Sequence, residues 1–305
     1  MKKRFETTSC GKWILVGEHA VLRGSTALVF PLFSAQLKFR FEPREGSEID
    51  LQLAGSAGNE LEVLFWGVLE KACGLMGRRR SEIGGVVSLT NEIRVGAGLG
   101  ASAAFCVAMA RWFASQEYIG VDQIEDFARE LENVFHGESS GVDVAVVHAE
   151  RPLKFQRGQQ KEFFVPRWTP GCYLTYSGQR GVTRECVDLV KELVLREPVR
   201  GAQLDAQMKE AAVMAEKALS SDHKEGFPIL KAAMELAALS FSGWGLLSGL
   251  PEKKAAELRA RGASQVKPTG SGGGGYLLSL WDQVPQDRRE LMSCFSSAFS
   301  PPTLP

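Results

Sequence analysis

The residues of this chain best suited to chemistry form a glycine cluster that leads directly into an apolar run. The cluster begins at residue 96, and the apolar run occupies residues 105–110. Glycines let the backbone approach a ligand closely, and the free N–H groups and the dipole at a helix N-terminus favour a phosphate. The pattern therefore predicts a phosphate-holding loop and helix start with the sequence Gly96-Ala97-Gly98-Leu99-Gly100-Ala101-Ser102.

Two better-known glycine templates compete with this interpretation. The P-loop type fails because no Gly-Lys-Ser/Thr follows the glycines, and Ser102 is the only hydroxyl in the right region. The dinucleotide-binding template is met in its relaxed form by residues 96–101, with Asp122 about 20 residues further on. Against it, segment 89–95 is more polar than a central parallel strand should be. A dinucleotide-binding oxidoreductase stays open as an alternative.

A second group of reactive side chains lies near the end of a predicted helix. Asp122 opens this helix, and Glu125 follows three residues later in the spacing of a capping box. Glu132 falls at the edge of the apolar stripe of the helix, and His136 lies one turn further on the same side. The helix therefore brings a carboxylate and an imidazole to a core boundary. A solvent-exposed Glu132, with His136 interacting only with the helix dipole, is the alternative.

The composition is typical of a globular protein with two medium-sized domains. The chain has 305 residues, 44% of them hydrophobic, which is enough for a sizeable core. Lysine plus arginine equals aspartate plus glutamate at 36 each, so no overall charge favours nucleic acid or an anionic membrane. Residues 1–6 lack the apolar core of a secretory signal, and segment 236–250 is too short to span a bilayer. We therefore expect a cytoplasmic protein without nucleic-acid or membrane partners.

The cysteines indicate neither a metal site nor a disulfide framework. Six of them are scattered along the chain, with no C-x-x-C pair. A zinc ribbon or a disulfide-rich scaffold would need closer and more regular spacing. We therefore expect buried or idle thiols.

The elements that must position the glycine loop are strands and helices of a mixed α and β domain. Strands are predicted at residues 12–16 and 26–30, the second ending at Pro31. Apolar and polar residues then alternate over residues 35–41, as in a strand with one face exposed to solvent. Residues 150–170 have the composition of a connection between domains.

A second unit is predicted to begin with a strand at residues 171–176. Helices are expected around residues 183–196, 201–220, 227–239 and 253–261. A second glycine loop, residues 269–275, then runs straight into a predicted strand at 276–280. A flexible linker has a similar composition, but its place between apolar runs favours a structural or phosphate-proximal turn.

Three separated segments agree in order and spacing with one group of enzymes. The first reads Gly11-Lys12-Trp13-Ile14-Leu15-Val16-Gly17-Glu18-His19-Ala20-Val21-Leu22-Arg23-Gly24, the second is the glycine loop 96–104, and the third reads Lys267-Pro268-Thr269-Gly270-Ser271-Gly272-Gly273-Gly274-Gly275. Together they resemble the GHMP small-molecule kinases, a family named after galactokinase, homoserine kinase, mevalonate kinase and phosphomevalonate kinase. Because the segments span nearly the whole chain, coincidence is improbable.

Within that family, the sequence is most similar to the mevalonate kinases. Gly17-Glu18-His19-Ala20-Val21 resembles their first motif, whereas galactokinases usually continue with Thr-Asp. His136-Gly137-x-Ser139-Ser140-Gly141-Val142-Asp143 is similar to the segment that carries their catalytic aspartate. The resemblance therefore implies ATP-dependent phosphorylation of a small hydroxylated carboxylate, mevalonate above all. Another acceptor of the same family, such as phosphomevalonate, a sugar or homoserine, is the alternative, and a non-catalytic ligand-binding relative is a third.

The resemblance also implies a role for individual residues. Asp143 would take the proton from the acceptor hydroxyl, and Lys12 would pair with Asp143. Residues Gly96 to Ser102 would hold the nucleotide phosphates, with Ser102 and Glu132 as ligands of Mg²⁺. The acceptor-binding residues implied are Glu18, His19 and Thr183. Positioning and charge neutralisation of this kind are what phosphoryl transfer requires, and oxygen ligands suit a hard cation.

The chain departs from the family pattern at four positions. Arg94 stands where proline is frequent, and Ala101 replaces one residue of a serine pair. Val144 follows the predicted catalytic aspartate in place of a common asparagine, and Ser139 replaces a frequent proline. Val144 and Ser139 flank the implied acceptor pocket. They therefore affect which acceptor is expected and not the expected phosphoryl-transfer reaction.

The resemblance implies an α+β fold of two domains. The N-terminal domain, residues 1–165, would be similar to domain 2 of ribosomal protein S5 and carry the phosphate loop. The C-terminal domain, residues 166–305, would be ferredoxin-like and carry the second glycine loop. The expected cofactors are ATP and Mg²⁺, the expected partner is the small-molecule acceptor, and a homodimer is compatible with the sequence.

Overall fold

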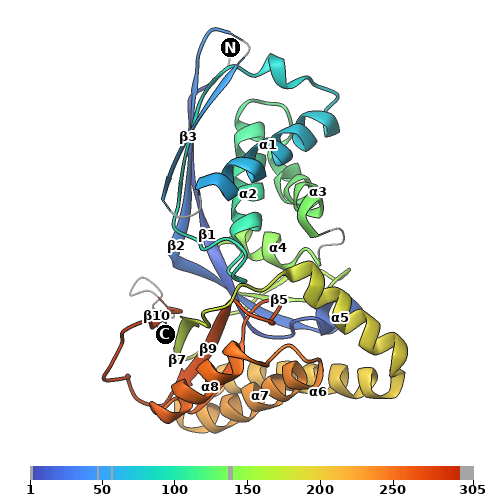
Figure 1. Ribbon diagram of the computed structural model, residues 1–305, viewed down its shortest axis with the longest axis vertical. Helices are drawn as coiled ribbons and strands as arrows, with labels where there is room; N and C mark the ends of the chain where they lie inside the picture. Colours follow the sequence, from blue (N-terminus) through green and yellow to red (C-terminus); the bar gives the residue numbers. More distant parts are fainter. Residues whose placement is uncertain (1–2, 47, 56–57, 137–139, 296–305) are drawn as a thin grey trace. The chain divides into compact units, whose positions relative to one another are not determined.

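The protein consists of two compact units. A computed structural model describes residues 3–46, 48–55, 58–136 and 140–295. Unit 1 comprises Met1–Gly11, Ala35–Val95 and Gly100–Glu150, and unit 2 comprises Lys12–Ser34, Gly96–Leu99 and Arg151–Pro305. The division falls inside the first two strands, β1 (Phe5–Val16) and β2 (Ala27–Pro43). Figure 1 shows helices and strands in both units, so the mixed α and β fold expected from the sequence is confirmed.

The strands of unit 1 form a mixed sheet. The β4 strand (Gly85–Asn91) pairs antiparallel with the second half of β2 and parallel with β3 (Ile49–Gly55). In that half of β2, Leu37, Phe39 and Phe41 are fully buried, whereas Lys38 and Arg40 are exposed. The alternation thus gives one face to the core and one to solvent, as predicted.

Helices cover the apolar face of this sheet (Figure 1). The helices of unit 1 are α1 (Gly58–Leu75), α2 (Ala101–Ser115), α3 (Ile124–His136) and α4 (Val142–Ala149), with 3₁₀ turns at Arg80–Glu82 and Val121–Gln123. Helix α2 is the central one, because most of its side chains are buried. Its Trp112 ring lies 5.2 Å from the Phe39 ring and 4.8 Å from the Phe41 ring, which joins helix and sheet.

The predicted break at Pro31 is wrong, because β2 runs through it as one strand. Proline lacks an N–H donor and so disrupts a strand only where a ladder bond is needed. Strand β5 (Leu153–Phe155) pairs with Ala27 to Val29 of β2, and β4 pairs with Leu37 to Pro43. Pro31 lies between these two ladders, so neither of them loses a hydrogen bond.

Unit 2 contains a four-stranded antiparallel sheet. Its strand order is β10 (Met292–Ser293), β7 (Gly171–Tyr176), β9 (Tyr276–Trp281) and β8 (Gln265–Pro268). Two short strands, β5 (Leu153–Phe155) and β6 (Glu162–Phe163), and a 3₁₀ turn at Ala20–Arg23 also belong to this unit. The region expected to be a plain connection between domains therefore contains β5 and β6.

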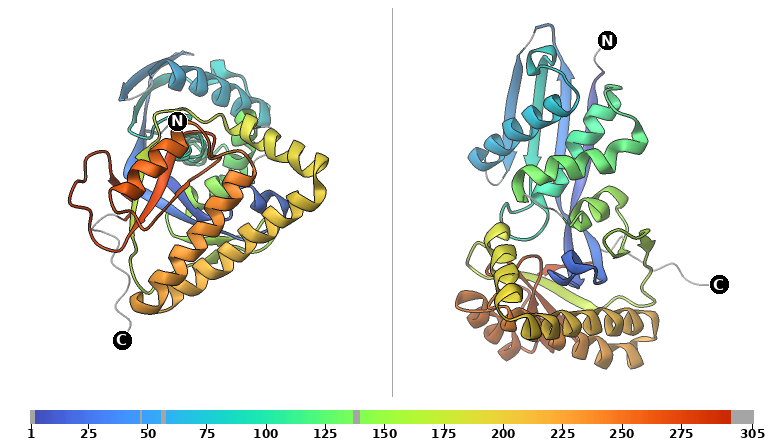
Figure 2. Two further views of the ribbon diagram at one scale, coloured as in Figure 1. Left: turned by 60° about the horizontal axis from the view of Figure 1, so that its bottom comes forward. Right: turned by 90° about the vertical axis from the view of Figure 1, so that its right-hand side faces the viewer.

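The helices of this unit are α5 (Thr183–Arg196), α6 (Pro198–Ser220), α7 (His223–Gly243) and α8 (Leu250–Ala260), of which α7 and α8 pack against the sheet. Figure 2 shows α6 and α7 lying side by side. Pro198 opens α6 at a position where its missing N–H costs nothing, and the Asp222 carboxylate caps α7 by accepting from Glu225 N at 3.0 Å. Leu258, Val266 and Leu277 form a core beneath α8.

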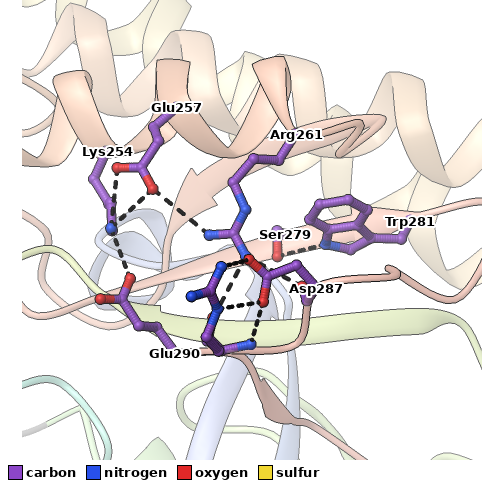
Figure 3. Close-up of polar contacts among 8 residues, drawn as sticks. Lys254, Glu257, Arg261, Ser279, Trp281, Asp287 and Glu290 are labelled. Carbon is purple, nitrogen blue, oxygen red and sulfur yellow. Dashed lines mark hydrogen bonds and ion pairs between the residues drawn. The ribbon is translucent and has the colours of Figure 1, made fainter.

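Ion pairs tie the segment between β9 and β10 to helix α8 (Figure 3). Lys254 Nζ lies 3.0 Å from Glu257 Oε2 and 2.9 Å from Glu290 Oε2. Arg261 Nη2 lies 3.8 Å from Asp287 Oδ2. Because these groups are partly exposed, each pair contributes little stability, and together they fix the course of the segment.

The two compact units are not continuous segments of the chain. Each of them is assembled from separate stretches of chain, and β1 and β2 contribute to both. The domain boundary near residue 165 stays a prediction. Among the helices that the structure describes, none has the length and apolarity needed to cross a membrane. The six cysteines are all buried and free, as expected.

Candidate active site

The predicted phosphate loop is a run of glycines in the left-handed backbone region. Gly96, Gly98 and Gly100 have φ angles of 68°, 83° and 76°, which favour residues without a side chain. Helix α2 begins at Ala101, and Gly100 supplies no side-chain cap to its first N–H groups. The loop therefore leads into a helix start, as predicted, whose N–H donors and dipole suit a phosphate.

The second glycine loop packs directly on the first, within unit 2. A Cβ atom on Gly98 would lie 2.9 Å from Thr269 O, and one on Gly275 would lie 2.5 Å from Ala97 O. Tyr276 N donates to Ala97 O at 3.1 Å. The stretch 269–275 is therefore a structural turn against the phosphate loop and not a linker.

Arg180 is a site residue that the sequence analysis missed. A Cβ atom on Gly96 would collide with the Arg180 guanidinium, so that side chain lies against the glycine loop. Gly274 in turn leaves room for the Arg180 backbone. Arg180 opens the segment 180–185, whose weaker likeness to the mevalonate kinases gave a role to Thr183 alone, because the place of Arg180 depends on glycines that are distant in sequence. It places a permanent positive charge beside the predicted phosphate site.

Three buried charges lie together in unit 2. Lys12, Glu18 and Lys267 are exposed by 2%, 2% and 0%. Lys12 N donates to Leu99 O at 2.9 Å, which ties β1 to the phosphate loop. Lys267 Nζ donates to Glu18 Oε1 at 2.6 Å. Burial raises the pKa of Glu18, and Lys267 and then Lys12 oppose that rise by attracting the ionised carboxylate.

His19 is buried and neutral. Burial lowers its pKa to about 4, and the nearby Arg23 lowers it further, while the Ser271 carbonyl and Asp205 act in the opposite direction. Its Nε2 lies 2.8 Å from Ser271 O, and because a carbonyl only accepts, Nε2 carries the proton. His19 also has a φ angle of 57°, which is uncommon outside glycine and typical of functional positions.

Ser271 connects His19 to Thr183. Besides accepting from the imidazole, Ser271 donates its hydroxyl to Thr183 Oγ1 at 3.4 Å. Thr183 is the first residue of α5. The three residues predicted to bind the acceptor, Glu18, His19 and Thr183, are therefore joined by contacts to the segment 267–271.

The remaining predicted site residues lie in unit 1, on three helices that pack against one another. Ser102 is in the first turn of α2, Glu132 is in the last part of α3, and Asp143 is in the first turn of α4. Glu132 is 1% exposed, so the solvent-exposed alternative for this residue is wrong. The residues 137–139, which include the Ser139 departure, lie outside the described part of the chain.

Ser102 and Glu132 share one neighbour. Cys106 lies one turn after Ser102 on the same face of α2. Burial, and then the negative charge of Glu132, raise the pKa of the Cys106 thiol well above its ordinary value. The Glu132 carboxylate is therefore close to the face of α2 that carries Ser102.

The oxygen atoms of Ser102 and Glu132 fit a hard divalent cation. A hydroxyl and a carboxylate, completed by phosphate and water oxygens, are the donors that Mg²⁺ prefers. Among the described residues, no group of three or more histidine, cysteine, aspartate and glutamate side chains could hold a metal by itself. The pairing of Lys12 with Asp143 joins residues of different units and stays a prediction.

The other three residues that depart from the family pattern differ in their exposure to solvent. Arg94 is exposed, Ala101 is buried at the start of α2, and Val144 is fully buried in α4. A cavity of about 710 Å³ in unit 2 lies elsewhere, between α8 and the strands β7, β9 and β10. Its lining contains none of the predicted site residues.

The sheet topology argues against the dinucleotide-binding alternative. In that template, the strand before the glycine loop lies beside the strand that follows the helix, and the two are parallel. Here β4 pairs antiparallel with β2, and the next strand, β5, pairs with β2 rather than with β4. The glycine loop is therefore not part of a dinucleotide-binding unit.

Comparison with known proteins agrees with this architecture. Residues 64–150 match the family described as GHMP kinases N terminal domain. Over these residues the chain is similar to the GHMP kinases, and over nearly its whole length it is similar to mevalonate kinases. Its mevalonate kinase relative from Aeropyrum pernix is 27% identical over 98% of this chain and 96% of the relative. The mevalonate kinase of Pyrococcus furiosus is 28% identical over 96% and 93% of the two chains.

The fold is shared with solved structures of this family. The L. major mevalonate kinase, solved in complex with R-mevalonate, superposes with a TM-score of 0.77. It covers 95% of this chain, and 92% of its own chain is matched, at 20% sequence identity. At that identity the likeness establishes the two-domain α+β fold, and the activity has to be argued from the residues.

Proposed function

We propose that this protein is an ATP-dependent kinase that phosphorylates the hydroxyl of mevalonate to give 5-phosphomevalonate. The observation that carries the proposal is near-complete alignment with curated mevalonate kinases, over 98% of this chain in one of them. The buried constellation of Lys12, Glu18 and His19 around the glycine loops supports it independently. Isoprenoid precursor synthesis is the pathway that such a product serves.

The phosphate loop is proposed to hold the nucleotide. Backbone N–H groups at the start of α2 bind phosphate oxygens, and Arg180 adds positive charge beside Gly96. Asp143 accepts the proton of the acceptor hydroxyl as the oxygen attacks the γ-phosphorus of ATP, and ADP leaves. Lys12 stabilises the ionised Asp143 and the developing negative charge.

Ser102 and Glu132 are proposed to hold Mg²⁺. When bound, the cation neutralises charge on the phosphate oxygens.

An acceptor panel tests the proposal. Purified protein is incubated with ATP and Mg²⁺ and with mevalonate, phosphomevalonate, homoserine or galactose, and ADP formation is measured. We expect mevalonate to give the highest kcat/KM by at least about tenfold. Turnover of another acceptor with no turnover of mevalonate would contradict the proposal. The proposal has two further parts, a cytoplasmic location and a homodimeric assembly. Size-exclusion chromatography with light scattering tests the dimer.

A further inference from the structure

Lys267 and Glu18 form an ion pair that is removed from solvent. Lys267 Nζ lies 2.6 Å from Glu18 Oε1, and the two side chains are exposed by 0% and 2%. Removing two charges from water is costly, and such a pair often contributes less stability than apolar residues of the same size. Stability alone therefore does not account for this pair.

The Lys267 ammonium has no donor left for a ligand. It donates to Glu18 Oε1 at 2.6 Å, to Pro268 O at 2.6 Å and to Ile14 O at 3.4 Å. An ammonium carries three protons, so these contacts use all of them. Its Nζ also lies 5.4 Å from the centre of the Phe241 ring. The lysine is thus held in place, and it acts on its surroundings through Glu18.

The second carboxylate oxygen of Glu18 is in a different situation. Glu18 Oε2 is buried and, among the described residues, has no hydrogen-bond partner. A buried carboxylate oxygen without a donor is unfavourable, and native structures rarely leave one unsatisfied. The atom therefore requires a donor that the described chain does not supply, and a hydroxyl of the bound acceptor is such a donor.

The neighbouring segment fixes the same region of β1. Thr269 Oγ1 accepts from Ile14 N at 2.9 Å and donates to Ile14 O at 3.0 Å. Ser271 holds His19, the residue after Glu18, through its carbonyl. Segment 267–271 therefore positions both residues that were predicted from the sequence to bind the acceptor.

We propose that Lys267 is a positioning residue of the acceptor site, which holds Glu18 by Oε1 so that Oε2 accepts a hydrogen bond from a hydroxyl of the acceptor. This inference rests on the proposed function, because it needs a hydroxylated acceptor beside Glu18. The sequence analysis included Lys267 in a motif without giving it a role. The contact joins residues that are 249 positions apart.

The charges around the pair give the proposal a pH signature. The titratable groups that face it are Lys12 on β1, Cys172 on β7 and Cys294, which follows β10. Burial raises the pKa of Glu18, and Lys267 is the strongest influence against that rise. Removing the Lys267 charge therefore raises the pKa of Glu18 further, so that the carboxylate ionises only at higher pH.

The test compares Lys267→Met with Lys254→Met. Lys254 also pairs with glutamates in unit 2, but at the surface of α8, so it is a matched control. For Lys267→Met we expect KM for mevalonate to rise at least about tenfold, with KM for ATP changed by less than about twofold. The acid limb of the kcat/KM profile moves up by about one pH unit. Lys254→Met leaves all three quantities unchanged.

A purely structural pair gives another result. Lys267→Met would then lower the melting temperature while KM for mevalonate and the acid limb stay as in the wild type, and that outcome overturns the proposal. If Lys267→Met does not fold, Glu18→Gln decides, because the amide keeps an oxygen for Lys267. We expect Glu18→Gln to raise KM for mevalonate and to take the ionisation of Glu18 out of the acid limb, which leaves that of Asp143; an unchanged KM and an unchanged acid limb would overturn the proposal.

Failure of the proposed function is recognised separately, in the wild-type protein. Should another hydroxylated acceptor of the panel turn over in place of mevalonate, the same variants are compared on that acceptor. A wild-type protein inert toward every acceptor contradicts the proposed function, and this inference with it.

Discussion

Several charged side chains of this protein are buried, where removing a charge from water is unfavourable, and Glu132 is one of them. It is 1% exposed on α3, and its carboxylate acts on the buried Cys106 thiol. We expect Glu132→Gln to raise the Mg²⁺ concentration for half-maximal activity at least about tenfold, because the proposed metal ligand loses its charge. Magnesium titrations of the kinase reaction measure this.

The control is Glu130→Gln, an exposed residue of the same helix. It should leave the magnesium dependence unchanged. Equal magnesium dependence in both variants would mean that Glu132 has only a structural role.

His19 gives the folded protein a pH-dependent stability. Its pKa is about 4 in the folded state against 6.5 for an ordinary histidine, because burial disfavours the charged form. Between these values the unfolded chain binds a proton that the folded chain does not, so stability is lost as pH falls below 6.5. From pH 7 to pH 5 the loss due to His19 is about 2 kcal/mol.

Urea unfolding of wild type, His19→Gln and His223→Gln at both pH values isolates this effect. His19→Gln should lose about 2 kcal/mol less than the wild type over that interval. His223 is exposed, and its variant controls for the loss of a histidine as such. An identical pH dependence in all three proteins would show that His19 is not buried as a neutral group.

At the scale of elements, the site depends on the contact between two glycine loops. Gly275 has a φ angle of 73°, and a Cβ atom there would lie 2.5 Å from Ala97 O. Gly178 has a φ angle of 88°, but a Cβ atom there would meet nothing within 4 Å. A side chain at either glycine would therefore strain the backbone, but only at Gly275 would it also collide with the other glycine loop.

We expect Gly275→Ala to lose at least about 2 kcal/mol more stability than Gly178→Ala, since both introduce the same left-handed strain and only one separates the loops. KM for ATP should rise about tenfold in Gly275→Ala and stay unchanged in Gly178→Ala. Urea unfolding and initial rates at varied ATP provide both quantities. Equal effects of the two substitutions would show that loop contact does not matter for the site.

The elements with strong local signals are the ones that the sequence predicted well. The predicted strand 171–176 and helix 183–196 have the same bounds as β7 and α5. The strand expected at 89–95 instead ends at Asn91, because its pairing with β2 and β3 fixes it from Gly85 onward. Short strands such as β5 depend on a distant partner, and no local pattern reveals them.

At the scale of the whole molecule, sequence reasoning found the motifs and missed the contacts between them. Lys12, Glu18, His19 and Thr183 were identified by resemblance, and the structure places them in one unit. The roles of Arg180 and Lys267 were missed, because each depends on a fold that joins residues far apart in the chain. The sequence also gave no sign that β1 and β2 contribute to both units.

The central claim is that this chain phosphorylates mevalonate with Asp143 as the base. The most direct measurement is ³¹P NMR and mass spectrometry of the products formed from ATP, Mg²⁺ and mevalonate by wild type and by Asp143→Asn, with ATP binding measured in parallel. We predict 5-phosphomevalonate from the wild type, and a rate at least about a thousandfold lower from Asp143→Asn with nearly unchanged ATP affinity. No phosphorylated mevalonate from the wild type, or near wild-type turnover by Asp143→Asn, would contradict the account.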